Sequence, residues 1–426
     1  MPSIAARART NPHPYLHGNF APLQQTLPLT PCPYTGAIPP SLHNGQYVRN
    51  GSNPLTNADP TRDAHWFDGD GMLAGVLFRR TPAGVAPAFV NQFVLTDVFL
   101  SARASPRLRI PILPSIATLV DPLARVLRVA CAILRTLLLI LLSHLPGSPH
   151  KIAKISVANT SVIYHDGRAL ALCESGPPMR IQLPGLESVG WFDGARAENE
   201  PPPPSPQPTL GQNAGLLTFM RQWTTAHPKL DPRTHELLLF HSSFAPPYVQ
   251  YSILPAAGSR LPKLLNAPVP GIASAKMMHD FGCSARHTVI LDLPLSLDPL
   301  NQLRARPPVA YDATSPARFG VFPRRAPAAV RWFETAACCI FHTAATWDEL
   351  DAQGNVSAVH LLACRLTSAT PVFAAGNLDP PVVRTADAQR MREKRRMPFS
   401  SRLRSPRSSE EDPLLPHAHS EEDPLL

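Results

Sequence analysis

The feature that most limits how this chain can fold is a short pattern repeated four times at long intervals. In each copy a polar turn precedes an apolar run, and these runs are 169–173, 236–240, 287–291 and 356–362. The turn before 169–173 is Asp166-Gly167, and two further turn dipeptides, Asn44-Gly45 and Asn50-Gly51, flank a short expected strand at 46–49. An apolar run of this length, bounded by turn residues, is typical of a buried strand. Copies roughly 50–70 residues apart indicate repeated sheets. They predict an all-β fold of the propeller type, in which the innermost strands face one axis.

Three of the sixteen histidines precede copies of this pattern. They lie in Thr225-Ala-His-Pro-Lys229, Lys276-Met-Met-His-Asp-Phe281 and Cys338-Cys-Ile-Phe-His-Thr343. His227, His279 and His342 are too far apart to share one helix or hairpin, so only a fold that returns to one axis could bring them together. Convergence would give a metal site, whereas the alternative is three ordinary surface or core histidines. No local pair such as His-x-x-x-His decides between these readings.

Six motifs of the chain resemble those of the carotenoid cleavage oxygenase family. Besides the three histidine stretches they are Asn44-Gly-Gln-Tyr-Val-Arg-Asn-Gly-Ser-Asn-Pro54, His65-Trp-Phe-Asp-Gly-Asp-Gly-Met72 and Ala158-Asn-Thr-Ser161. They occur in the family's order, between about Tyr15 and about Leu366. The resemblance implies a seven-bladed β-propeller with a helical cap. It also implies ferrous iron held by four histidines, and cleavage of a carbon–carbon double bond with O2.

The resemblance assigns His227, His279 and His342 as ligands of Fe(2+), with no catalytic residue beyond the metal ligands. Imidazole suits Zn, Cu, Fe and Ni alike, so the histidines by themselves do not name the metal. Glu174 lies where the family keeps an acid that accepts the N–H of an iron-bound histidine, an interaction that fixes the imidazole tautomer. Without the family, Glu174 would be a solvated acid at the end of a strand.

The fourth ligand is unknown. In the family it lies in a Gly-Phe-His-Gly-like setting well over a hundred residues after the third, whereas 84 residues follow His342 here. His417 and His419 lie among proline and acidic residues with nothing strand-like around them. The resemblance also fades after Leu366. We therefore expect an incomplete propeller, about five blades' worth of a C-terminally truncated family member, whose activity the missing ligand would impair.

The expected domains are a flexible N-terminal arm (1–20), the oxygenase-like propeller (21–375) and a disordered tail (376–426). The 51 prolines fit a loop-rich β protein better than a helical one. A Pro-rich stretch at 198–212 predicts an exposed insertion between blades. The tail is basic and then acidic, and it repeats Ser-Glu-Glu-Asp-Pro-Leu-Leu. This repeat resembles an acidic dileucine sorting signal, the alternative being a disordered tail without function.

Residues 109–146 interrupt the β pattern. Within them Leu123–Leu142 is very apolar and has the length of a helix. Arg125, Arg128 and Arg135 would share one narrow stripe of that helix, opposite a broad aliphatic surface. The longest uncharged run is far shorter than the roughly 20 residues of a transmembrane span. We expect a helix lying in the membrane interface with its arginines at the lipid head groups, the alternative being a buried core helix.

Composition limits the compartment and the partners. Seven cysteines are odd in number and lack zinc-type spacing, and the first ten residues hold no apolar signal run. These features predict an intracellular protein, cytoplasmic or peripheral to a membrane, that is not secreted. The formal net charge is +9, but the basic run at 384–407 has no recognised motif or interleaved aromatics. No nucleic-acid partner is therefore expected.

The sequence thus predicts a non-haem Fe(II) dioxygenase that cleaves a double bond of a carotenoid or apocarotenoid with O2 to give aldehyde or ketone products. The expected partners are an apolar polyene, O2 and a membrane surface contacted through 109–146. Two alternatives stay open: an oxygenase that cleaves stilbene-type double bonds, and a non-catalytic truncated protein that binds carotenoid or membrane. The interfacial helix favours the carotenoid, because a soluble phenolic substrate needs no membrane docking.

Overall fold

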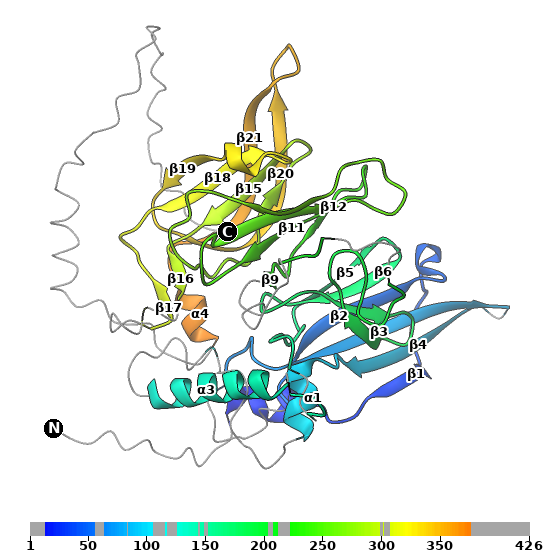
Figure 1. Ribbon diagram of the computed structural model, residues 1–426. Helices are drawn as coiled ribbons and strands as arrows, with labels where there is room; N and C mark the ends of the chain where they lie inside the picture. Colours follow the sequence, from blue (N-terminus) through cyan, green and yellow to red (C-terminus); the bar gives the residue numbers. More distant parts are fainter. Residues whose placement is uncertain are drawn as a thin grey trace, which may run out of the picture. The chain divides into compact units, whose positions relative to one another are not determined.

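The computed structural model describes residues 13–55, 64–82, 84–104, 116, 126–143, 145–148, 152–202, 208–211, 222–298, 301 and 307–375. In these ranges most of the regular structure consists of antiparallel strands in six sheets, three of them four-stranded and one five-stranded (Figure 1). The sequence predicted an all-β fold, and the described residues are mostly β. The predicted tail at 376–426 lies outside the described residues.

Residues 13–20, at the end of the predicted arm, are folded. They form two short 3-10 helices, η1 (Pro14–Leu16) and η2 (Gly18–Phe20). The Tyr15 hydroxyl donates to the Ala374 carbonyl at 3.3 Å, and its ring lies 4.6 Å from that of Trp66. The folded part of the chain thus begins before residue 21.

The first sheet has the order β1-β4-β3-β2. Its strands are β1 (Leu27–Pro31), β2 (Gln46–Asn53), β3 (Asp70–Thr81) and β4 (Gly84–Phe93). A turn at Asn44 is present, with φ 61°. The turn expected at Asn50-Gly51 is not, because β2 runs through both residues, which pair with Leu73 and Met72 of β3. Continuous pairing with β3 overrides the local turn preference of this dipeptide.

The second sheet is a meander of β5 (Ser161–His165), β6 (Arg168–Leu172), β7 (Met179–Gln182) and β8 (Glu187–Trp191). Asp166 and Gly167 join β5 to β6 with φ of 50° and 74°. Positive φ at both positions is the hairpin geometry that Asp-Gly favours, so this predicted hairpin is confirmed. Buried side chains shared by the first two sheets include Leu73, Val90 and Ala171.

Hydrogen bonds also join the family-like motifs of these two sheets. The Asn50 side chain donates to the Ala158 carbonyl at 2.7 Å. The Asn159 side chain donates to the Ser52 hydroxyl at 3.0 Å and to the Gly69 carbonyl at 2.9 Å. Three motifs that are distant in sequence are therefore hydrogen-bonded to one another.

The third sheet carries β9 (Trp223–Thr224), β10 (Lys229–Leu230), β11 (Leu237–Ser242), β12 (Val249–Leu254) and β13 (Leu264–Pro268). Both β9 and β10 pair with β11. The predicted apolar run 236–240 lies almost entirely in β11, whose residues are buried up to His241. A buried cluster joins this sheet to the next through Leu238, Tyr251 and Ile290.

The fourth sheet has the order β14-β15-β18-β19, and two strand pairs lie beside it in sequence. The strands of this sheet are β14 (Gly282–Cys283), β15 (His287–Asp292), β18 (Ala317–Pro323) and β19 (Arg331–Thr335). One strand pair consists of β16 (Leu295–Leu297) and β17 (Val309–Tyr311). The other consists of β20 (Cys339–Leu350) and β21 (Val356–Leu366). The predicted runs 287–291 and 356–362 lie in β15 and β21, which confirms both strands. β15 is also almost wholly buried, as expected, whereas no residue of β21 is buried, so that part of the prediction was wrong for 356–362.

The described helices are few and short apart from one. They are α1 (Asp97–Ala104), α3 (Val126–Ser143) and α4 (Thr370–Ala374), with 3-10 turns η3 (Pro40–Leu42) and η6 (Pro327–Ala329). α3 falls within the predicted helical stretch, whose first residues, 123–125, lie outside the described ones. None of the described helices is long and apolar enough to span a membrane.

α3 has two different faces. Leu139 and Ile140 are buried in a cluster with Val98 of α1 and Ile152. Exposed leucines lie at 134, 137, 138 and 141, a spacing that puts them on one side of the helix. Arg135, from the predicted basic stripe, is half-buried. The helix is therefore neither wholly core nor wholly surface.

The Pro-rich stretch at 198–212 is described only in part, since residues 203–207 and 212 lie outside the described ranges. Pro201, Pro202 and Pro208 are exposed, as expected for an insertion. Leu210 is buried against Phe192 and Leu237, so the end of the stretch returns to the core.

Candidate metal centre

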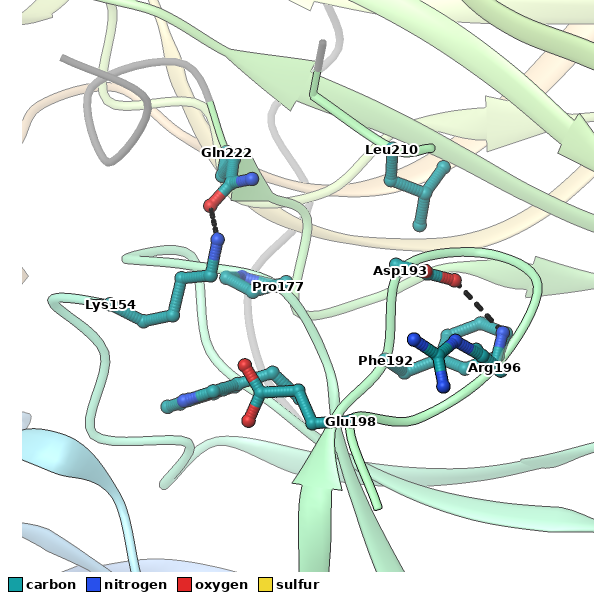
Figure 2. A pocket seen from close by; sticks show the side chains of 9 residues that line it. Lys154, Pro177, Phe192, Asp193, Arg196, Glu198, Leu210 and Gln222 are labelled. Carbon is teal, nitrogen blue, oxygen red and sulfur yellow. Dashed lines mark hydrogen bonds between the residues drawn. The ribbon is translucent and has the colours of Figure 1, made fainter. Parts of the chain in front are cut away.

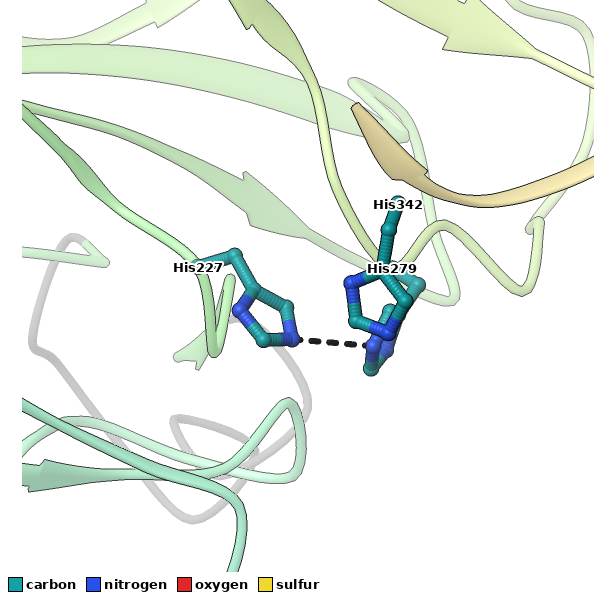
Figure 3. Close-up of side chains that lie close together, drawn as sticks. All are labelled: His227, His279 and His342. Carbon is teal, nitrogen blue, oxygen red and sulfur yellow. Dashed lines mark hydrogen bonds between the residues drawn. The ribbon is translucent and has the colours of Figure 1, made fainter. Parts of the chain in front are cut away.

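The three predicted histidines converge. One ring nitrogen from each of His227, His279 and His342 lies within 4.8 Å of the others (Figure 3). The Nε2 atoms of His227 and His279 are 2.9 Å apart. Among the residues that the structure describes, this is the one cluster of histidine, cysteine or acidic groups with such spacing.

His227 lies in a bulge of the third sheet. Thr224 of β9 pairs with His241 and Lys229 of β10 pairs with Leu238, so the four residues 225–228 that join β9 to β10 lie opposite two residues of β11. The Thr225 N–H donates to the Phe240 carbonyl at 3.0 Å and anchors the start of the bulge. Bulges re-aim side chains and are common beside active sites. This one turns His227 out of the ladder and toward the other two histidines.

His342 also lies in a bulge. In the β20–β21 pair the register shifts between Ile340 and Thr343, which adds one residue to β20. His279 follows Lys276, which forms an isolated bridge with Ser296, and precedes β14. Each of the three histidines therefore occupies a break in strand pairing, where its side chain is free of the alternation of a regular strand.

The segments carrying His279 and His342 approach closely at Gly282, the first residue of β14. A Cβ atom at Gly282 would lie 2.7 Å from the Thr346 hydroxyl of β20 and 2.9 Å from a methyl of Leu361 in β21. Real Cβ contacts are not this short, so a larger residue would force the Thr346 and Leu361 side chains to move. Glycine at 282 thus permits the close approach of β14 to β20 and β21.

Glu174, just after β6, forms a short hydrogen bond with Nδ1 of His279. Burial works to raise the pKa of Glu174, but the bond from His279 and the charge of that ring outweigh burial, so the pKa lies below its ordinary value. With Nδ1 directed at Glu174, the His279 ring presents Nε2 to the centre. Glu174 therefore lies where an acid that orients a metal ligand would be needed.

The environment keeps two of the imidazoles neutral. Burial, followed by the proximity of His279, lowers the pKa of His227 to about 4. The same two causes lower the pKa of His342. Neutral imidazole is the form that binds a metal ion, so the donor set fits a cation at neutral pH. The triad is thus consistent with a metal site.

Sequence reasoning did not find the aromatic side chains beside the centre. The Phe341 ring lies 5.6 Å from that of His279 and 6.4 Å from that of Phe67. Phe341 immediately precedes His342, and Phe67 belongs to the His65–Met72 motif. The adjacency of Phe341 to a ligand was the available signal, whereas no local pattern indicated Phe67.

A separate pocket of about 190 Å³ lies in the second sheet and its neighbouring loops (Figure 2). Its lining is mixed in polarity and consists of Lys154, Pro177, Trp191, Phe192, Asp193, Arg196, Glu198, Leu210 and Gln222. Lys154 donates to Gln222 across it. None of the three histidines lines this pocket, and His417 and His419 lie outside the described residues.

Residues 20–420 match the model of the family described as retinal pigment epithelial membrane protein. The chain belongs to this family, the carotenoid cleavage oxygenases. Carotenoid dioxygenase carX of Gibberella fujikuroi is 57% identical to this chain, over 87% of this chain and 54% of its own length. Carotenoid 9,10(9',10')-cleavage dioxygenase 1 of Phaseolus vulgaris is 33% identical, over 83% of this chain and 57% of its own length. The chain spans about half the length of the curated relatives it matches.

Two solved structures share the fold of this chain. Lignostilbene dioxygenase of Pseudomonas brassicacearum matches with a TM-score of 0.56 and 23% identity, covering 84% of this chain and 69% of that one. Cobalt-substituted Synechocystis ACO matches with a TM-score of 0.51 and 21% identity, covering 77% and 60%. The sheets described above therefore have the propeller fold of these oxygenases, as the sequence predicted.

Proposed function

We propose that this protein is a non-haem Fe(II) dioxygenase that cleaves a carbon–carbon double bond of a carotenoid or apocarotenoid with O2. The observation that carries the proposal is the convergence of His227, His279 and His342 within 4.8 Å. Relatives that are named carotenoid dioxygenases support the substrate class. The products would be aldehydes or ketones.

In this proposal the three histidines hold the iron. Bound Fe(II) would supply the redox-active centre at which O2 and the double bond react. Neutral imidazoles bring no anionic charge to the metal, while Glu174 fixes the His279 ring through Nδ1. The aromatic rings of Phe341 and Phe67 would exclude water from the apolar substrate beside the centre. The fourth ligand of the family stays unassigned in this chain.

We also propose that the sheets are consecutive blades of the family's seven-bladed propeller, with the described residues supplying about five. The first, second, third and fourth sheets and the β20–β21 pair would each be one blade or part of one. This assignment agrees with the antiparallel order of every sheet. It explains why histidines from the third, the fourth and the β20–β21 blades face one axis.

The proposal extends to the exposed face of α3, which would lie in a membrane interface near the source of a water-insoluble substrate. Replacing Leu138 and Leu141 together by serine should weaken binding to phosphatidylcholine vesicles at least about tenfold, since each leucine contributes roughly 1.5–3 kcal/mol when buried. Leu362→Ser on β21, which removes an equally exposed leucine elsewhere, is the control. Equal effects of the two changes would contradict the assignment of α3.

The activity itself is tested by loading the purified chain with Fe(II) without oxygen and then adding O2 with β-carotene. The proposal expects about one iron per chain and O2-dependent release of apocarotenals. Release of aldehydes from a stilbene but not from β-carotene would overturn the substrate class. Iron-free protein that still binds vesicles and carotenoid would overturn the enzyme assignment in favour of a binding protein.

A further inference from the structure

Each of the three histidines is followed, within two positions, by a polar residue, and these three polar residues contact one another. Lys229 is two positions after His227, Asp280 is one after His279, and Thr343 is one after His342. These three residues form a single polar cluster, called here the Asp280 cluster. It joins the same three segments as the candidate metal centre.

The contacts centre on the Asp280 carboxylate. Its Oδ1 lies 2.6 Å from the ammonium of Lys229. Its Oδ2 accepts from the backbone N–H of Thr343 at 2.8 Å and from the Thr343 hydroxyl at 2.9 Å. Lys229 also donates to the Thr343 hydroxyl at 3.3 Å, which closes a ring of contacts through the third, the fourth and the β20–β21 sheets.

The backbone around each of the three histidines requires support from contacts other than strand pairing. Each histidine lies at a break in strand pairing, so regular ladder hydrogen bonds do not fix the backbone there. A second contact supplies part of this support, since the Thr225 hydroxyl donates to the His279 carbonyl at 3.2 Å and accepts from the His227 N–H at 3.0 Å. That pair reaches two segments, whereas the Asp280 cluster reaches all three.

Burial of the Asp280 carboxylate means that it needs partners within the cluster. The Asp280 side chain is 2% exposed and that of Lys229 is 29% exposed. A buried carboxylate is costly unless paired and hydrogen-bonded, so the position of Asp280 is strongly dictated by Lys229 and Thr343. Buried ion pairs add little net stability compared with apolar packing, and their best-attested use is to fix one arrangement.

We propose that Asp280, with Lys229 and Thr343, is a positioning residue that holds the three histidine segments at the spacing a metal ion requires. The inference rests on the proposed metal site and adds to it a device that sets metal affinity. Asp280 has no hydrogen bond to an imidazole among the described contacts, so it acts through the backbone of His279 and Thr343. It is not itself a ligand in this proposal.

The chain offers a matched control at Asp348. That carboxylate is 5% exposed and accepts from the Ser284 hydroxyl at 2.7 Å, the Arg286 N–H at 2.9 Å and the His287 ring at 2.8 Å. Asp348 of β20 thus connects β20 to the β14–β15 hairpin. Asp280 likewise connects the segment just before β14 to Thr343 of β20. Asp348 lies six positions beyond His342, so losing it should loosen the sheets without displacing the ligand segments.

The test compares Asp280→Asn with Asp348→Asn in the full chain, with Co(II) as the probe. Outer partners of metal ligands typically contribute about 10–100-fold to affinity. We expect Asp280→Asn to weaken Co(II) binding by this factor and to shift the visible absorption bands of the bound ion. Asp348→Asn should bind within about twofold of the unchanged protein. Unaltered affinity and bands in Asp280→Asn, or an equal loss in Asp348→Asn, would overturn the proposal.

Two further measurements keep the test decisive. If Asp280→Asn does not fold, Thr343→Val should weaken Co(II) binding while Thr343→Ser, which keeps the hydroxyl, restores it; equal affinities in the two would count against the cluster. Hydrogen exchange of metal-free protein should rise at 225–229 and 339–343 in Asp280→Asn and not in Asp348→Asn. If the unchanged protein binds no Co(II), the proposed metal site fails, and the exchange result still decides whether Asp280 positions these segments.

Discussion

His241 on β11 and His227 in the neighbouring bulge belong to the same sheet, yet their ring nitrogens face different groups. His241 is 1% exposed, with Nδ1 3.0 Å from the Thr224 hydroxyl and Nε2 2.9 Å from the Ser252 hydroxyl. His227 instead directs Nε2 at the Nε2 of His279. Both nitrogens of His241 have hydroxyl partners, whereas two imidazoles of the centre face each other.

The difference teaches which property marks a ligand. Burial lowers the pKa of His241 to about 3 and, with His279 nearby, that of His227 to about 4. Burial and a lowered pKa are therefore common to a structural and a candidate ligand histidine. What separates them is convergence, because several ring nitrogens around one point favour a cation more than a hydroxyl.

The largest expected effect comes from removing one converging imidazole. His279→Ala should lower the affinity for Co(II) by at least about 100-fold, more than the loss of an outer partner causes. His241→Ala removes an imidazole from the same region and should retain metal binding wherever it is folded. Isothermal titration of both variants makes the comparison. Loss of metal in His241→Ala, with His279→Ala unaffected, would reverse the roles assigned here.

A smaller effect is expected from the acid that orients His279. Glu174→Gln keeps an acceptor for Nδ1 but removes the negative charge, so Co(II) affinity should fall about tenfold, at the lower end of the range for such partners. Glu174→Ala should cost more, because Nδ1 loses its acceptor altogether. Competition with a chelator of known affinity measures both. A greater loss in the glutamine variant than in the alanine variant would contradict the role of the hydrogen bond.

The smallest effect is a change of folding stability with pH, and it concerns His241 rather than the histidines of the centre. A free histidine has a pKa near 6.5, and that of folded His241 is about 3, so between these values the unfolded chain binds more protons. Stability from this group is therefore full above about pH 6.5 and is lost as pH falls, by up to about 1.4 kcal/mol per pH unit.

Urea unfolding of metal-free protein at pH 7, 6 and 5 tests this sign. His241→Asn cannot titrate in this range, so its stability should decline less steeply with falling pH than that of the unchanged chain. The difference between the two slopes isolates His241 from other titrating groups. Parallel slopes would show that His241 is not held neutral by the fold.

The sequence predicts well what is local or repeated. Turn dipeptides and apolar runs located β5, β6, β11, β15 and β21, because each depends on neighbouring residues. The convergence of the histidines followed from repetition, since blades that share an axis bring equivalent positions together. The Asn50-Gly51 turn was wrong, because pairing of β2 with β3 outweighs a dipeptide preference.

Other features depend on contacts that a sequence does not show. Asp280, Lys229 and Thr343 look like ordinary polar residues until three sheets bring them together. The exposed leucine face of α3 depends on which side packs against α1, which periodicity alone leaves open. Phe67, which lies between β2 and β3, contacts Phe341 beside the centre although the two are far apart in sequence.

Anomalous diffraction at the iron edge, from crystals of the Fe(II)-loaded protein, tests the central claim most directly. The account predicts one strong peak with a ring nitrogen of His227, of His279 and of His342 each about 2 Å away, as in other imidazole–metal bonds. A peak at any other position, or an iron that contacts only one of these histidines, would contradict it.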